Sequence, residues 1–158
     1  YTSDQDDQLI RRTLETNDNV ISSSNSIMAN NLYKLHKIFH DQGYSERAFT
    51  MLNAMQNNFE TSAQGFANWL HLVLFKNFNF YEIAVIGDGY QEIGKDLSQQ
   101  YLPNSIMVGC QKESTLALLK NRFVPNKTMA YVCIEGSCKL PVGTVPEVLG
   151  QVSWQQKN

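Results

Sequence analysis

The sequence contains few cysteines and no excess of charge of either sign. Three cysteines among 158 residues are too few for a secreted domain held together by disulfides. A cytoplasmic origin is therefore the default expectation. Thirteen Lys and Arg face 15 Asp and Glu, which gives a formal net charge of -2 without a basic stripe. This balance argues against a nucleic-acid partner.

Long hydrophobic runs, internal repeats and low-complexity linkers are also missing. The longest strongly apolar stretch runs from Trp69 to Phe75 and is interrupted by His71. A membrane-spanning helix needs about 20 such residues, so no membrane span is expected. No signal peptide is visible. With 42% hydrophobic and 18% charged residues, the chain has the composition of a globular protein with one domain or two small lobes.

The hydrophobic period changes near Phe80, and this change predicts the architecture. Before it, apolar residues recur at helical spacing; after it, short β-type runs alternate with helical ones. We expect an α+β fold: a helical segment over residues 1–79, forming a three-helix cluster, packed on a small α/β lobe of three to four strands over 80–158. The polar start without Met suggests a piece of a longer protein, with a short strand over 8–13.

Capping residues and apolar stripes place the three helices of the first half. The run from Ser22 to Asn25 precedes the first helix, which Gly43 is expected to end. Ser45 is expected to cap a second helix that reaches Phe59. The third, over 63–76, has almost no polar face and must be covered on most sides. We expect it to pack on the second half or on another copy of the chain, as a homo-oligomer.

The second half begins with a β-branched run typical of an interior strand, and turn residues divide the rest of this half into short elements. The expected elements are a strand over 81–86, a helix over 90–101, a parallel strand over 105–108, a short helix over 114–119, a strand over 128–134, a hairpin return over 137–140 and a last helix from Thr144 to about Val152.

Two cysteines flank the predicted two-residue turn Glu135-Gly136, which places Cys133 directly opposite Cys138. Three states of this pair remain open. A reduced pair packed as small apolar side chains is favoured, because cytosolic thiols stay reduced. A cross-strand disulfide, structural or redox-active, is the second. Zinc is the third, although two cysteines without a second pair make an incomplete site.

The loop before the first helix concentrates small polar side chains at a helix N-terminus, including Glu15, Asp18, Ser23 and Asn25. Such an end favours anions or hydroxyl-rich ligands, and Glu15 or Asp18 would suit sugar chemistry, where paired acids are needed. The favoured alternative is a helix cap with an Asx-type turn.

Other candidate groups have stronger structural explanations. The Gly87-Asp88-Gly89 turn is similar to the start of a dinucleotide fingerprint, but Glu92 stands where the third glycine belongs, so a plain βα turn is favoured. His36 and His40 are four residues apart and could reach one metal ion; we expect interfacial or solvated side chains instead. His71 is expected to be a hydrogen-bonded core residue. No cofactor or metal is predicted.

Five motifs, in order, resemble one known family. They are Glu15…Asp18…Ser23-Ser24-Asn25-Ser26, Gly65-Phe66-Ala67-Asn68-Trp69, Tyr81-Glu82-Ile83-Ala84-Val85-Ile86-Gly87, Gln100-Tyr101-Leu102-Pro103-Asn104 and Ala130-Tyr131-Val132-Cys133…Cys138…Pro141-Val142. From about Leu9 to Val152, the chain resembles the C-terminal part of the thioredoxin-domain-containing proteins of the spermatogenesis-associated protein 20 type.

This resemblance implies a layout: a thioredoxin-like domain, an α/α-toroid similar to six-hairpin glycosidases, and a terminal α/β lobe. The helices here would be the last hairpins of the toroid, and Glu15, Asp18, Ser23 and Asn25 would line its cavity. The partners would be the missing regions of the parent chain. The fragment would be noncatalytic alone, and its parent would act on carbohydrate or redox substrates. The alternative function is a self-standing protein–protein interaction module.

Overall fold

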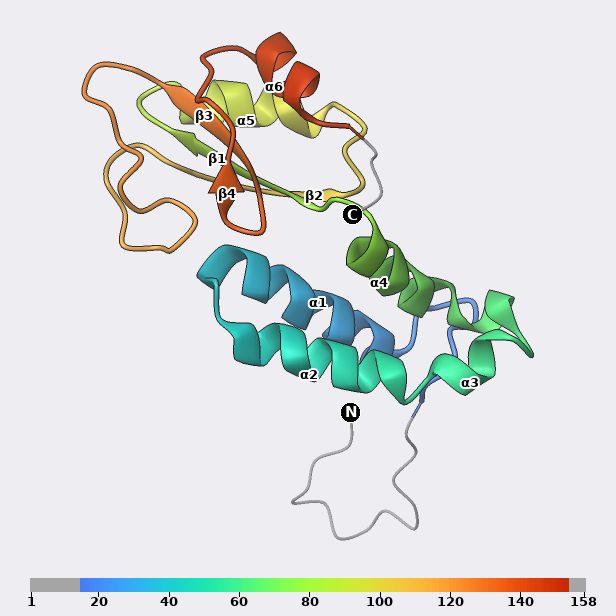
Figure 1. The fold of residues 1–158 in the computed structure, drawn as a ribbon. Helices are drawn as coiled ribbons and strands as arrows, with labels where there is room; N and C mark the ends of the chain where they lie inside the picture. Colours follow the sequence, from blue (N-terminus) through green and yellow to red (C-terminus); the bar gives the residue numbers. More distant parts are fainter. Residues whose placement is uncertain (1–14, 154–158) are drawn as a thin grey trace, which may run out of the picture.

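The computed structural model describes residues 15–153 and has an α+β fold. A helical cluster at the N-terminal side packs on a four-stranded mixed sheet (Figure 1). In chain order, the elements are α1 (Ser24–Phe39), α2 (Gln42–Asn53), α3 (Gln56–Phe59), a 3₁₀ turn (Ala63–Phe66), α4 (Ala67–Asn77), β1 (Tyr81–Ile86), α5 (Tyr90–Ser98), β2 (Ser105–Cys110), β3 (Met129–Ile134), β4 (Ser137–Cys138) and α6 (Val145–Gln151). The expected strand over 8–13 lies outside the described residues.

The sheet has the strand order β2-β1-β3-β4, so β1 is an interior strand. Strands β1 and β2 are parallel, with Tyr81 opposite Ser105, which confirms the predicted strand–helix–strand unit. Strand β3 runs antiparallel to β1, and β4 returns beside β3. All six residues of β1 are buried, as expected for a strand that is covered on both faces.

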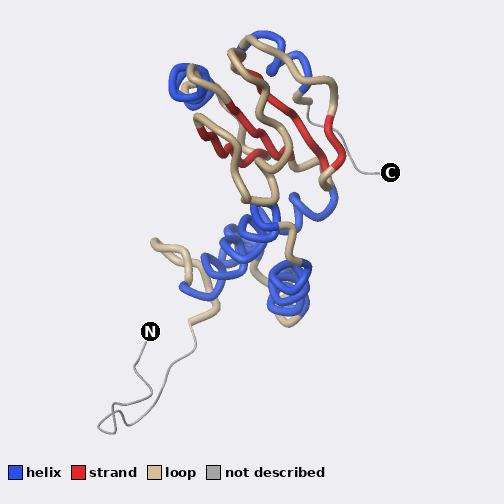
Figure 2. Tube along the Cα trace, turned by 90° about the vertical axis from the view of Figure 1, so that its left-hand side faces the viewer, coloured by secondary structure: helices blue, strands red, loops and turns tan. Residues whose placement is uncertain are grey.

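Side chains of β1 alternate between two separate cores. Tyr81, Ile83 and Val85 pack with α5 and α6 on one face, together with Leu97 and Val148. Ala84 and Ile86 pack on the other face against the chain around Leu118 and Leu119. Glu82 lies on the same face as Ala84 and Ile86, because alternate side chains of a strand point to the same side. Figure 2 shows the helical cluster lying beyond one end of the sheet, away from α5 and α6.

The junction between α1 and α2 differs from the prediction. Ser23 caps α1 as expected, and its hydroxyl accepts from the Ser26 N–H. The helix ends at Phe39, and its C-cap His40 takes a left-handed conformation with φ 55°. Asp41, rather than Ser45, caps α2 by accepting from the Gly43 N–H at 2.9 Å. Gly43 therefore belongs to the first turn of α2.

Several element boundaries were also predicted wrongly. The second helix does not continue to Phe59, because the chain turns at Ala54 and Met55 before α3 begins. The third helix begins with a 3₁₀ turn. Residues 114–119 do not form a helix, because 114–116 are irregular and a turn begins at 117, although Leu118 and Leu119 are buried. Apolar side chains alone therefore do not make this short segment helical. The hairpin return is only two residues long.

A third hydrophobic core holds the helical cluster together. Trp69, Leu72 and Phe75 of α4 are buried among residues of α1 and α2 such as Tyr33 and Leu52. The helix was expected to be covered on most sides, and Leu74 is the large apolar side chain of α4 that stays exposed, at 39%. No helix among residues 15–153 combines the length and apolar character needed to cross a membrane.

Candidate functional site

The β3–β4 hairpin carries a disulfide between Cys133 and Cys138. The two residues are cross-strand partners, as predicted, with Cα atoms 3.9 Å apart. The favoured alternative, a reduced pair, is not the state in the structure. Cys133 is fully buried and Cys138 is exposed, so solvent reaches the bridge from the side of Cys138. Within residues 15–153, no group of three or more potential ligands could hold a metal ion.

The guanidinium of Arg122 lies against both sulfur atoms of this bridge. Its Nη1 is 3.0 Å from Cys133 Sγ and 2.7 Å from Cys138 Sγ. Arg122 is held in place by Tyr131, whose ring lies 5.3 Å from the guanidinium carbon and whose hydroxyl donates to the Arg122 carbonyl at 2.8 Å. A fixed cation beside a sulfur stabilises the thiolate over the thiol. Partial burial lowers the pKa of the Arg122 guanidinium.

A buried ionic cluster joins the same hairpin to α1. Lys37 Nζ lies 3.4 Å from Glu82 Oε1 and 2.7 Å from Glu135 Oε2, and the Lys37 and Glu82 side chains are each 1% exposed. Glu82 also accepts from the Gly136 N–H at 3.1 Å. His40 Nε2 is 3.7 Å from Glu82 Oε2. Sheet, helix and hairpin turn thus meet at one buried carboxylate.

Sequence reasoning did not identify this cluster, although a signal was present. Glu82 is the single charged residue in the run Tyr81–Ile86, and a buried glutamate requires a partner. Its partner could not be identified from the sequence, because Lys37 lies far away in the chain, on a helix of the other half. Burial, together with the Glu135 and Glu82 carboxylates, raises the pKa of the Tyr33 phenol, whose ring lies 5.2 Å from Lys37 Nζ.

Asp18, a predicted cavity residue, caps two helices at once. Its carboxylate accepts from the Ser23 N–H at 2.8 Å and the Ser26 hydroxyl at 2.6 Å, both at the start of α1. The other oxygen accepts from the Asn68 N–H at 2.9 Å, at the start of α4. The side chain is buried, with 6% exposure. Its hydrogen bonds are therefore made within the chain itself.

The other predicted cavity residues belong to the same loop. Ser23 is fully buried, and its hydroxyl donates to the Thr16 carbonyl at 3.3 Å. Asn25 donates to the Glu15 carbonyl at 2.7 Å, and the Glu15 residue is exposed. The Thr16 carbonyl also accepts from Trp69 Nε1 at 2.8 Å. The structure thus brings these residues into one network that fixes the loop to α1 and α4.

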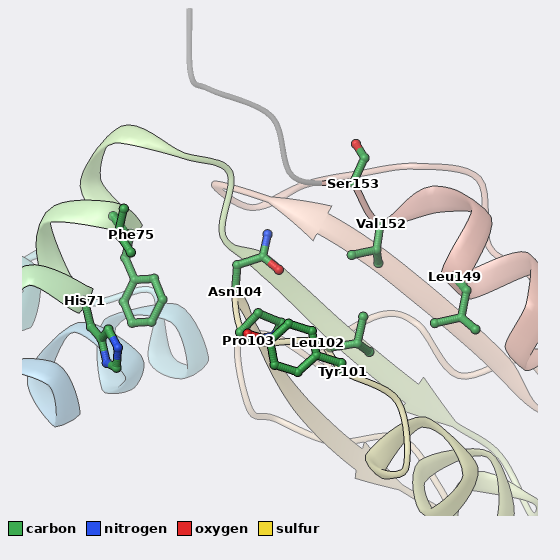
Figure 3. A pocket seen from close by; sticks show the side chains of 10 residues that line it. His71, Phe75, Tyr101, Leu102, Pro103, Asn104, Leu149, Val152 and Ser153 are labelled. Carbon is green, nitrogen blue, oxygen red and sulfur yellow. The ribbon is translucent and has the colours of Figure 1, made fainter. Parts of the chain in front are cut away.

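A larger cavity lies elsewhere, between α4 and the α/β lobe. It has a volume of about 580 Å³ and is mostly apolar (Figure 3). Its lining includes His71, Phe75, Tyr101, Leu102, Leu149 and Val152. His71 is exposed at this edge, so the expectation of a core histidine is wrong. None of the four predicted cavity residues lines this space.

The glycine turn after β1 packs against the chain's own backbone. Gly87 has φ 125°, and a Cβ there would collide with the Lys127 carbonyl. The Gly89 N–H, at the start of α5, donates to the Thr128 hydroxyl at 2.9 Å. Both glycines thus serve a close approach of chain segments, which agrees with the plain βα turn.

His36, one of the two histidines considered as a metal pair, has its Nδ1 3.0 Å from the Asp41 carbonyl.

Comparisons with protein-family models, with curated proteins and with solved structures find no match to this chain.

Proposed function

We propose that the chain is the C-terminal part of a cytoplasmic thioredoxin-domain-containing protein of the spermatogenesis-associated protein 20 type, noncatalytic alone. In this proposal α1, α2 and α4 are the last hairpins of an α/α-toroid, and the sheet is the terminal lobe. The ordered motifs of the sequence support it. So does the pairing of α1 and α2 as a helical hairpin closed by a short turn at His40 and Asp41.

Of the two substrate classes, the redox class has the stronger support. Both Asp18 oxygens accept hydrogen bonds from the chain itself, which leaves this carboxylate poorly suited to sugar chemistry. The Cys133–Cys138 bridge has an exposed sulfur and a cation held against both sulfurs. In a cytoplasm that keeps thiols reduced, disulfides are usually transient, catalytic or redox-sensing. We therefore propose that this hairpin exchanges electrons with a dithiol of the thioredoxin type.

The exchange step follows from the burial of the two sulfurs. A thiolate of the dithiol attacks Cys138 Sγ, a new mixed disulfide forms, and the Cys133–Cys138 bond breaks. Cys133 leaves as a thiolate beside Arg122 and takes a proton from solvent. The second thiol of the dithiol then loses its proton and attacks the dithiol sulfur of the mixed disulfide, and Cys138 leaves as a thiolate that takes a proton from solvent. The dithiol is oxidised by two electrons, and the hairpin disulfide is reduced to two thiols.

Replacing Arg122 with Met is expected to slow this exchange by about tenfold, because a charge-assisted contact to the leaving sulfur is lost. The measurement is the rate at which reduced thioredoxin opens the bridge, followed by alkylation and mass spectrometry. Lys120→Met is the matched control, since Lys120 is a nearby exposed cation. Equal rates for the two variants would remove Arg122 from the mechanism, and failure of thioredoxin to open the wild-type bridge would refute the redox proposal.

The second candidate is a protein–protein interaction module, and exposed apolar side chains favour it. Val20 and Ile21 lie in the loop before α1 with exposures of 103% and 77%, and Ile27 and Met28 lie near its start with 43% and 38%. In the toroid proposal, the missing parent helices would cover them; in the module proposal, a separate partner or a second copy would. The oligomeric state of the purified chain distinguishes these. A strictly monomeric, well-folded chain counts against the truncated toroid and against cover by a second copy, and it leaves a separate partner as the cover.

A further inference from the structure

A small polar pocket lies where α1, α2, α4 and the hairpin turn meet. Its volume is about 170 Å³, and its lining includes Tyr33, His36 and Lys37 of α1, Ser45 of α2, Lys76 of α4 and Glu135 of the turn. Two lysines and one carboxylate thus face a space shared by four elements. This pocket is separate from the apolar cavity between α4 and the α/β lobe.

Lys37 lines this pocket, and its ammonium group is ion-paired with carboxylates in poor hydrogen-bond geometry. It is buried and close to two carboxylates, but it makes no hydrogen bond of good geometry. An ammonium has three N–H donors, and a buried donor without an acceptor is costly. The group can therefore accommodate an acceptor better placed than the carboxylates that now surround it.

The second lysine of the pocket, Lys76, lies against one ring of an aromatic pair. Lys37 Nζ lies 5.2 Å from the Tyr33 ring centroid, and Lys76 Nζ lies 5.5 Å from that of Phe49. The Tyr33 and Phe49 centroids are 5.7 Å apart. Two cations are thus placed beside neighbouring rings at the same pocket.

Glu135 occupies the position that an anionic ligand would take. Its carboxylate is 2.7 Å from Lys37 Nζ, and the side chain is 52% exposed, so it can leave without dismantling the core. Its backbone has φ 50°, a left-handed conformation that favours Gly or Asn. The chain thus places a glutamate at a turn position where its backbone is unfavourable, directly over a buried cation.

We propose that this pocket binds a small oxyanion, a carboxylate or a phosphate, whose oxygens displace the Glu135 carboxylate from Lys37. Lys76 would provide the second positive charge, whereas the Ser45 hydroxyl on the pocket wall already donates to the Gln42 carbonyl at 2.9 Å. Glu82 stays in place, held by the Gly136 N–H and by Lys37. The site does not depend on the redox proposal, because neither cysteine of the bridge lines the pocket.

The test is a titration with inorganic phosphate and, separately, with acetate, at constant ionic strength, followed by the amide resonances of Gln42 and Ser45. Saturable shifts are expected with at least one anion, and the comparison shows whether the site takes phosphate or carboxylate. Glu135→Gln is expected to tighten binding by about tenfold, because the competing carboxylate is removed. Lys76→Met is expected to weaken it by a similar factor.

Lys34→Met is the matched control, because Lys34 is an exposed lysine of the same helix as Lys37 and does not line the pocket. It should leave anion affinity unchanged. The proposal is overturned if neither anion saturates in wild type and in Glu135→Gln. Equal effects of Lys34→Met and Lys76→Met, or weaker binding by Glu135→Gln, would overturn it as well.

Discussion

Replacing Trp69 with Ala is expected to lower the free energy of unfolding by about 3–5 kcal/mol. Trp69 is 1% exposed and lies in the helical core, so its removal leaves a large cavity between α1, α2 and α4. The change also removes the hydrogen bond from the indole N–H to the Thr16 carbonyl, which keeps the Ser23 hydroxyl as a donor. Urea unfolding followed by circular dichroism measures the difference.

Tyr101→Ala is the control for this prediction, because Tyr101 is 90% exposed and exposed substitutions usually change stability by about 0.5 kcal/mol or less. Trp69→Phe, which keeps an aromatic ring, should fall between the two. A loss below about 1 kcal/mol for Trp69→Ala would mean that α4 is not packed as the structure has it.

Replacing Lys37 with Met is expected to cost about 3–5 kcal/mol, because it leaves the Glu82 carboxylate buried without its cation. The two side chains are buried to the same degree, and the contact joins the helical cluster to the central strand. The double variant Lys37→Met/Glu82→Leu should recover much of this loss, since replacing both members of a buried pair by apolar residues is often nearly neutral.

Lys34→Met again provides the control, as it removes an exposed lysine from the same helix with little expected change. A double-mutant cycle measures the coupling between the Lys37 and Glu82 side chains. If the double variant were as unstable as the sum of the two single losses, Lys37 and Glu82 would not be acting as a pair. A loss below about 1 kcal/mol for Lys37→Met alone would contradict the buried ionic cluster.

Local sequence signals predicted those parts of the fold that depend on local chemistry. The serine run located the start of α1, and the β-branched run located β1 as an interior strand. The Glu135-Gly136 turn determined the hairpin register, and therefore placed Cys133 opposite Cys138. Each of these follows from residues within a few positions of one another.

Features that depend on distant parts of the chain were missed. The conformation of residues 114–119 depends on the packing of Leu118 and Leu119 against Ala84 and Ile86 of β1. There the Leu118 N–H donates to the Ile38 carbonyl of α1, a contact that the local sequence does not reveal. The cap of α2 was missed for a local reason, because Asp41 and Ser45 are residues of similar capping ability that lie four positions apart. The Lys37–Glu82 pair and the Arg122 contact to both sulfurs join residues that only the folded chain brings together.

The most direct test of the redox proposal is to trap the mixed disulfide. The oxidised chain, with the free thiol Cys110 replaced by Ser, is incubated with a reduced thioredoxin variant whose resolving cysteine is Ser. The products are alkylated and mapped by peptide mass spectrometry. We expect a covalent adduct through Cys138, with Cys133 recovered as an alkylated thiol. An adduct through Cys133, or no adduct while a small phosphine reduces the same bridge, would contradict the proposed exchange.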